Sequence, residues 1–106
     1  MVKTVQIGEK EVRMRVSAAV PLLYRNTFKS DLFIDLMGLG KGNEELAIME
    51  RLAYIMAKHA DESIPDDIVE WLSGFKVADI YNASIDILKT WEEDVKTEVK
   101  GAKKLP

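Results

Sequence analysis

Near its start the chain reads VKTVQIGEKEVRMRV (residues 2–16), and this stretch decides the class of fold. Apolar and polar residues alternate on both sides of Gly8-Glu9-Lys10, which is typical of two β-strands joined by a short glycine turn. In the second strand Val12, Met14 and Val16 share one face, whereas charged residues occupy the other. Because a lone hairpin is only marginally stable in water, we expect helices to cover its apolar face.

Helical spacing of apolar residues begins directly after the hairpin. Ser17 is the expected N-cap of a first helix with Pro21 in its first turn, and Ser30 is the expected cap of a short second helix that stops at Gly38. The glycine-rich stretch 38–43 then predicts a flexible connector. The first helix has apolar residues at helical spacing, namely Val20, Leu23, Tyr24 and Phe28, and the second runs through Leu32, Phe33, Leu36 and Met37.

A long third helix is predicted after Asn43, its expected N-cap. Its apolar stripe consists of Leu46, Met49, Leu52, Ala53, Met56, Ala57 and Ala60. Since Ile48, Tyr54 and Ile55 widen this surface beyond a single stripe, we expect the helix to be central.

Two further helices complete the prediction. Pro65 opens a short one that ends at Ser73-Gly74, with Ile68, Val69, Trp71 and Leu72 as its packing residues. The last covers roughly residues 77–96, with an apolar stripe of Val77, Ile80, Tyr81, Ser84, Leu88, Trp91 and Val95 and with Ile85 and Ile87 on its flanks. The expected fold is α+β: an N-terminal β-hairpin packed on four to five α-helices, forming one domain over residues 1–97, with a flexible lysine-rich tail over 98–106.

Composition narrows the classes of function. The net charge is -3, from 15 Lys and Arg against 18 Asp and Glu, and the pI is near 5.2. Nucleic acid is therefore a poor expectation as a partner. Cysteine is absent, which excludes disulfides, thiolate zinc sites and thiol nucleophiles. No apolar run approaches a membrane span or a signal peptide, so we expect a soluble protein that is not secreted and has no membrane partner.

No group of residues has the spacing of a catalytic, cofactor or metal site. His59 is the single histidine and is expected to be a partly exposed helix residue. The acidic pairs 61–62 and 66–67 lack the alternation of a calcium loop, and the acidic run 92–94 is expected to be a solvated helix face. The glycines around Lys41 lack the spacing of a phosphate-binding loop. We therefore expect no enzyme activity, no cofactor and no metal.

Two sets of large apolar residues could each belong either to the core or to an interaction site. Trp71, Phe75 and Trp91 are expected to fill the core between the last two helices. The second set surrounds the second helix, where apolar residues lie on nearly every side next to a glycine-rich loop, so complete burial is difficult. We therefore predict a partner-binding surface formed by Leu32, Phe33, Leu36, Met37 and Leu39.

Several local strings, in this order, resemble the tail assembly chaperones of long-tailed, siphovirus-type phages and prophages of Gram-positive bacteria. Beyond the two strands around Gly8-Glu9-Lys10, they are Ala18-Ala19-Val20-Pro21-Leu22-Leu23-Tyr24-Arg25 with Phe28, Asp31-Leu32, Leu52-Ala53-Tyr54-Ile55-Met56-Ala57-Lys58, Trp71-Leu72 with Phe75, Asp79-Ile80-Tyr81, and Trp91. The resemblance covers nearly the whole chain.

The resemblance implies a protein that binds the long, hydrophobic tape-measure protein in the host bacterial cytoplasm, keeps it soluble and is displaced as tail-tube subunits polymerise. It also implies absence from the mature virion and a longer frameshifted form of the same protein as a partner. The tail-tube protein and a homo-oligomer are further expected partners. The alternative is a small DNA-binding or regulatory protein of a prophage, against which the acidic pI argues.

Overall fold

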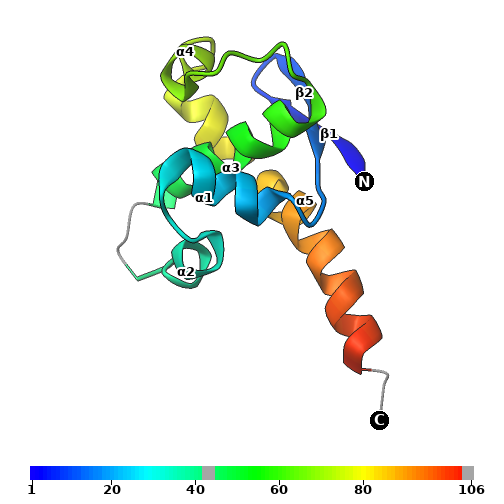
Figure 1. Ribbon diagram of the computed structural model, residues 1–106. Coiled ribbons are helices and arrows are strands. Elements are labelled where there is room, and N and C mark those ends of the chain that lie inside the picture. Colours follow the sequence, from blue (N-terminus) through cyan, green and yellow to red (C-terminus); the bar gives the residue numbers. More distant parts are fainter. Residues whose placement is uncertain (42–44, 104–106) are drawn as a thin grey trace.

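The computed structural model describes residues 1–41 and 45–103, with side chains described as far as Val95. A two-stranded antiparallel hairpin is followed by five helices, which confirms the predicted α+β fold (Figure 1). In chain order the elements are β1 (Val2–Ile7), β2 (Lys10–Arg15), α1 (Val20–Phe28), α2 (Leu32–Met37), α3 (Glu45–Ala60), α4 (Ile68–Leu72) and α5 (Val77–Lys103).

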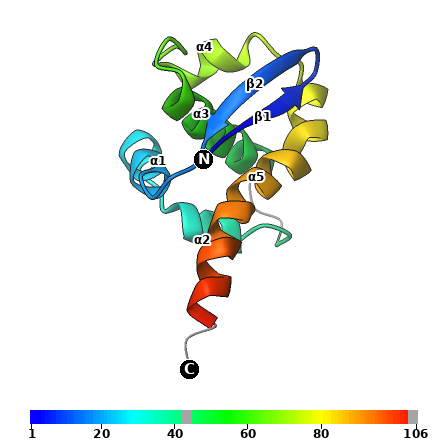
Figure 2. The ribbon, with the colours of Figure 1, turned by 90° about the vertical axis from the view of Figure 1, so that its right-hand side faces the viewer.

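The hairpin pairs Val5 with Val12 and Ile7 with Lys10 across its two strands. Val5, Ile7, Val12 and Met14 form its buried face, as the alternation predicts. That face lies against two helices, because β2 packs on α3 and β1 packs on α5. Figure 2 shows the hairpin toward the viewer, with α3 behind it and α5 running beside it.

Helix α3 is the centre of the fold. It contacts β2 and all four other helices, and eight of its sixteen residues are buried. Ile48, Tyr54 and Ile55 are among the buried ones, so the prediction of a central helix is confirmed. The expected cap at Asn43 lies outside the described residues. A helix that is apolar on several sides is stable in water only when neighbours cover those sides.

Two predicted helix caps were wrong. Helix α1 begins at Val20, and its N-cap, Ala19, makes no side-chain cap bond. The Ser17 hydroxyl instead accepts the Ala19 N–H within the preceding turn, at 3.2 Å. In α2 the cap is Asp31, whose carboxylate accepts the Ile34 N–H at 3.1 Å. A serine two residues before the N-cap can accept within its own turn, so spacing alone did not distinguish the two roles.

The three large aromatic anchors do not share one core between α4 and α5, contrary to prediction. Trp91 is 5% exposed, and its ring lies 5.9 Å from that of Phe33 in α2. Trp71 and Phe75 are partly buried and pair with each other at 5.0 Å, while Trp71 lies 5.7 Å from Tyr54 of α3. The separation arises because Trp91 lies about four turns along α5, far from the end that adjoins α4.

Helix α5 differs from its prediction in length. It begins at Val77 and continues to Lys103, whereas residue 96 was expected to be near its end. At about 1.5 Å per residue it is about 40 Å long, and its C-terminal part extends away from the other elements (Figure 1). The backbone of residues 98–103 continues this helix, and residues 104–106 of the expected tail lie outside the described residues. The predicted flexibility of residues 98–106 stays a prediction.

Candidate interaction surface

The five predicted partner-binding residues lie partly in the core and partly on the surface. Leu32 is 1% exposed and belongs to the core, and Leu36 and Leu39 are partly buried against it. Phe33 and Met37, one helical turn apart on another side of α2, are 50% and 74% exposed. The prediction that all five residues form a surface was therefore wrong for Leu32, because one side of α2 must pack on the core.

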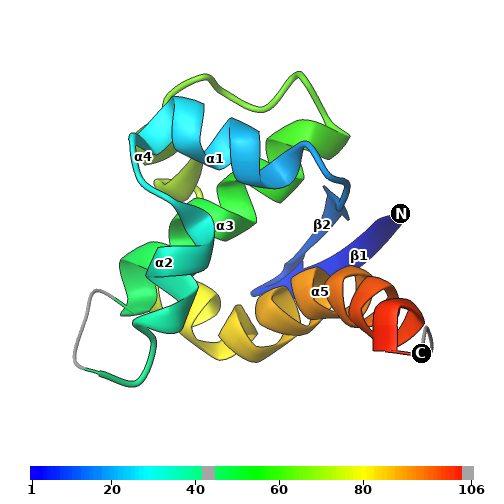
Figure 3. The ribbon, with the colours of Figure 1, turned by 60° about the horizontal axis from the view of Figure 1, so that its bottom comes forward.

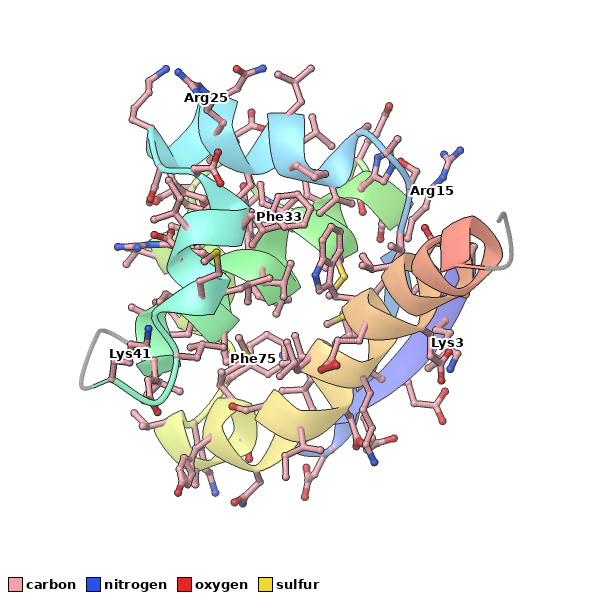
Figure 4. The ribbon with its side chains drawn as sticks, turned by 90° about the horizontal axis from the view of Figure 1, so that it is seen from below. Lys3, Arg15, Arg25, Phe33, Lys41 and Phe75 are labelled. Atoms are coloured by element: carbon pink, nitrogen blue, oxygen red, sulfur yellow. The ribbon has the colours of Figure 1, made fainter. Side chains whose placement is uncertain are left out.

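The exposed side of α2 carries three large apolar side chains, which we call the α2 patch: Phe33, Ile34 and Met37. Sequence reasoning missed Ile34, which is 69% exposed. The spacing of Ile34 and Met37, i and i+3, is the signal that could have found it. Phe33 is the inner edge of the patch, because it is half buried and its ring contacts that of Trp91 edge to face. Figure 4 shows Phe33 pointing from α2 into the space between α2 and α5.

A polar cluster holds α2 on α1. The hydroxyl of Tyr24, fully buried in α1, donates to the Asp35 carboxylate at 2.7 Å, and the Ser30 hydroxyl donates to the same carboxylate at 2.8 Å. Burial, together with the adjacent Asp35 carboxylate, raises the pKa of Tyr24, and Arg51 opposes that rise. The phenol therefore stays protonated and donates throughout the physiological pH range. This fixed contact orients the α2 patch toward solvent.

A second apolar feature lies between α3 and α5. It is a groove of about 490 Å³, called here the α3–α5 groove. The described residues that line it are Leu39, Glu45, Leu46, Met49, Tyr81, Ser84, Ile85 and Leu88. Tyr81 and Ile85 are 66% and 68% exposed, so the groove is open to solvent. Figure 3 shows α5 running below α3, with α2 beside one end of α3.

The side of α5 that is buried differs from the predicted one, and the side left exposed forms a wall of the groove. Among residues 77–95 of α5, the buried ones are Ile80, Ala83, Ile87, Thr90 and Trp91. Tyr81, Ser84 and Leu88, which were expected in the packing stripe, line the groove instead, and Val77 is 73% exposed. Helix α5 has apolar residues on more than one side, and the hairpin covers only one of them. On α4, Val69 is likewise exposed rather than packed.

Few polar atoms in the groove are available to a ligand. The Ser84 hydroxyl donates to the Ile80 carbonyl at 2.9 Å within α5. One carboxylate oxygen of Glu45 accepts the Gly40 N–H at 2.7 Å, which ties the loop after α2 to the start of α3. Among the described lining residues, Glu45 alone carries a charge. The groove is therefore suited to apolar contact, with one acidic position at its edge.

The acidic residues considered as metal ligands have other roles. Asp61 accepts the backbone N–H and the hydroxyl of Ser63, and these bonds lower the pKa of Asp61. Asp66 pairs with Lys58 at 2.7 Å, which lowers the pKa of Asp66. Asp67 caps α4 by accepting the Val69 N–H. Within residues 1–41 and 45–95, no group of three or more His, Asp or Glu side chains is arranged to hold a metal ion.

His59 lies at the junction between the hairpin and α3, and it is partly exposed as predicted. Its Nε2 is 2.8 Å from the Ser17 hydroxyl. Burial lowers the pKa of His59, and Arg15 and the N-terminal amine add to this effect. The lowered pKa favours the neutral imidazole, which is a hydrogen-bond partner of Ser17.

No protein-family model, curated protein or solved structure matches the chain. Over the described residues, no helix is long and apolar enough to cross a membrane.

Proposed function

We propose that this protein is a tail assembly chaperone of a siphovirus-type phage or prophage. It binds the tape-measure protein in the host bacterial cytoplasm, keeps that protein soluble and leaves as tail-tube subunits polymerise, so that it is absent from the mature virion. A longer frameshifted form of the chain, the tail-tube protein and further copies of the chain are its other proposed partners. The proposal rests on the resemblance described above and on one structural observation.

That observation is the exposure of large apolar side chains in the α2 patch and at the α3–α5 groove. Met37 and Ile34 of the α2 patch are 74% and 69% exposed, and Tyr81 and Ile85 at the groove are 66% and 68% exposed. Contiguous apolar surface on a small domain is a mark of an interaction site. The methionine side chain adapts to varied partner surfaces, which suits a long client with many different segments.

The charge of the chain supports the same proposal. A net charge of -3 on 106 residues produces only weak repulsion between neighbouring copies. Many copies can therefore line one tape-measure chain, each covering a stretch of its apolar surface.

Coexpression with the tape-measure protein of the same genome tests the proposal. We expect the tape-measure protein to be soluble and to copurify with the chain, and to precipitate without it. Replacing Ile34 and Met37 together by serine should reduce both the soluble fraction and copurification. The matched control replaces Leu22 of α1 and Val69 of α4 by serine, since these side chains are 60% and 65% exposed but lie outside both apolar features.

Two results would contradict the proposal. One is a tape-measure protein whose solubility and copurification do not depend on the chain. The other is tight binding of duplex DNA in a filter assay at low salt, which would favour the regulatory alternative.

A further inference from the structure

We propose that the α3–α5 groove binds one amphipathic α-helix of the partner, through large apolar side chains about one turn apart and a lysine or arginine beside Glu45. This inference rests on the proposed function for the name of the partner, the tape-measure protein. The kind of occupant follows from the groove itself.

The walls of the groove exclude an extended peptide as a good ligand. All of the described lining residues except Leu39 belong to helices, and beyond the first turn of α3 their backbone N–H groups are paired within α3 and α5. An extended chain would lose water from its N–H and C=O groups here without finding partners, which costs free energy for each group buried. A helix pairs its own backbone groups and presents only side chains, so it avoids this cost.

The lining also disfavours a small polar ligand. Sites for small molecules combine an apolar wall with several polar groups that converge on the ligand. In the groove, the Ser84 hydroxyl donates to its own helix and the Glu45 carboxylate accepts from Gly40. The remaining described wall consists of apolar side chains and of Tyr81, whose hydroxyl is its one further strong hydrogen-bonding group. Apolar side chains spaced at i, i+3 or i+4, and i+7 on a helix match a groove of this type.

Charge distinguishes the proposed partner helix from a second copy of this chain. Glu45 is exposed at the edge of the groove, so a basic residue on the flank of the bound helix is favoured. One exposed apolar helix that a second copy could offer is α2, which has Asp31 as its N-cap and contains Asp35 and no basic residue. Those carboxylates would lie close to the Glu45 carboxylate and be repelled by its like charge. A partner helix with a basic flank is therefore favoured over the α2 patch of another copy.

Overlapping peptides of about 20 residues from the tape-measure protein, labelled with a fluorophore, test the inference by anisotropy titration against the full chain. We expect a subset with an apolar stripe and a basic flank to bind and to become helical by circular dichroism. Ile85→Glu should weaken binding of those peptides by at least about tenfold, because it places a charge in the apolar contact. The matched control is Val77→Glu on the same helix, outside the groove lining and 73% exposed, which should leave binding unchanged.

Charge reversal at the groove edge gives a second measurement. Glu45→Lys should weaken the binding of peptides with a basic flank. It should strengthen the binding of versions of those peptides in which glutamate replaces the basic residue. Equal effects of Ile85→Glu and Val77→Glu, or binding that does not respond to Glu45→Lys, would overturn the inference.

The outcomes for the groove and for the proposed function can be distinguished. If the full tape-measure protein copurifies with Ile85→Glu as well as with the unchanged chain, and no peptide responds to the variant, the groove inference fails while the chaperone function stands. If sedimentation shows oligomers that Ile85→Glu dissociates and no peptide binds, a second copy occupies the groove and the inference is overturned. If no tape-measure segment binds and copurification is also absent, both fail together.

Discussion

The hydroxyl of Ser17 lies 2.8 Å from Nε2 of His59, and this contact joins the end of the hairpin to the last turn of α3 across 42 residues of chain. The Ser17 oxygen also accepts the Ala19 N–H, and the imidazole tautomer sets which of Ser17 and His59 donates in the contact between them. Arg15 and the N-terminal amine are the positive groups that act on the ring. A third positive charge at this corner is therefore unfavourable.

This corner predicts a loss of stability in mild acid. The pKa of His59 in the folded chain lies below its ordinary value of 6.5, so between these two values the unfolded chain binds more protons. The free energy of unfolding should be constant above about pH 7 and fall as the pH decreases below about 6.5. Urea unfolding between about pH 5 and 7.5 measures the slope. Asp61 and Asp66, whose pKa values are lowered, lose their contributions only at more acid pH.

His59→Gln is the control for this slope, because glutamine keeps a hydrogen-bonding group beside Ser17 and does not titrate in this range. The free energy of unfolding of the variant should depend less on pH between about 5 and 7 than that of the unchanged chain. Identical slopes would show that His59 does not cause the acid sensitivity.

A side chain at Gly8, in the hairpin turn, should destabilise the fold. Gly8 has φ +62°, and a Cβ atom there would lie 2.6 Å from the Asp79 carboxylate, which accepts the Lys76 N–H at the start of α5. Gly8→Ala should therefore lower the free energy of unfolding by about 2–3 kcal/mol, from the positive φ and from displacement of Asp79.

Gly40→Ala is the matched control for Gly8. Gly40 has φ +82°, but a Cβ atom there meets nothing within 4 Å. The substitution should cost only the conformational term, about 1 kcal/mol, in the same urea titration. If the two substitutions lower the free energy of unfolding equally, the close approach of Gly8 to Asp79 does not contribute to the effect.

Stability should depend on the tyrosine that anchors α2. Tyr24→Phe removes the phenol bond to Asp35 and should cost about 1.5 kcal/mol, whereas Asp35→Ala should cost more because it leaves the buried hydroxyl without its acceptor. Tyr81→Phe is the control, because Tyr81 is largely exposed, and it should have little effect. Hydrogen exchange should also become faster in α2 of Asp35→Ala. Unchanged exchange there would contradict an anchoring role for Asp35.

The residues of α2 should differ sharply in their effect on thermal stability. Leu32→Ala should cost about 2–5 kcal/mol because Leu32 is fully buried. Phe33→Ser should cost about 1 kcal/mol through its contact with Trp91, and Met37→Ser should cost less than about 0.5 kcal/mol. Calorimetry of the three variants measures the order. A large loss for Met37→Ser would show that Met37 belongs to the core and not to an interaction surface.

The sequence by itself determined the elements whose signal is local. Strict alternation in residues 11–16 predicts a strand with one buried face, and the structure confirms burial of Val12 and Met14. In α3 the apolar residues lie on several sides, so the helix had to be central wherever its neighbours came from. Gly38 ends α2 as predicted, because a glycine there does not favour further helix. These outcomes depend on residues close together along the chain.

Only the tertiary structure decided which side of an ambiguous helix became buried. Helix α5 carries Ile80 and Ile87 on one side and Tyr81 and Ile85 on another, and periodicity alone does not rank the two sides. Packing of β1 against α5 buries the first side and leaves the second open as the α3–α5 groove. The burial of Leu32 and the pairing of Ser17 with His59 were decided in the same way. Each depends on a partner distant along the chain, because burial is set by what packs against a residue and not by its neighbours in sequence.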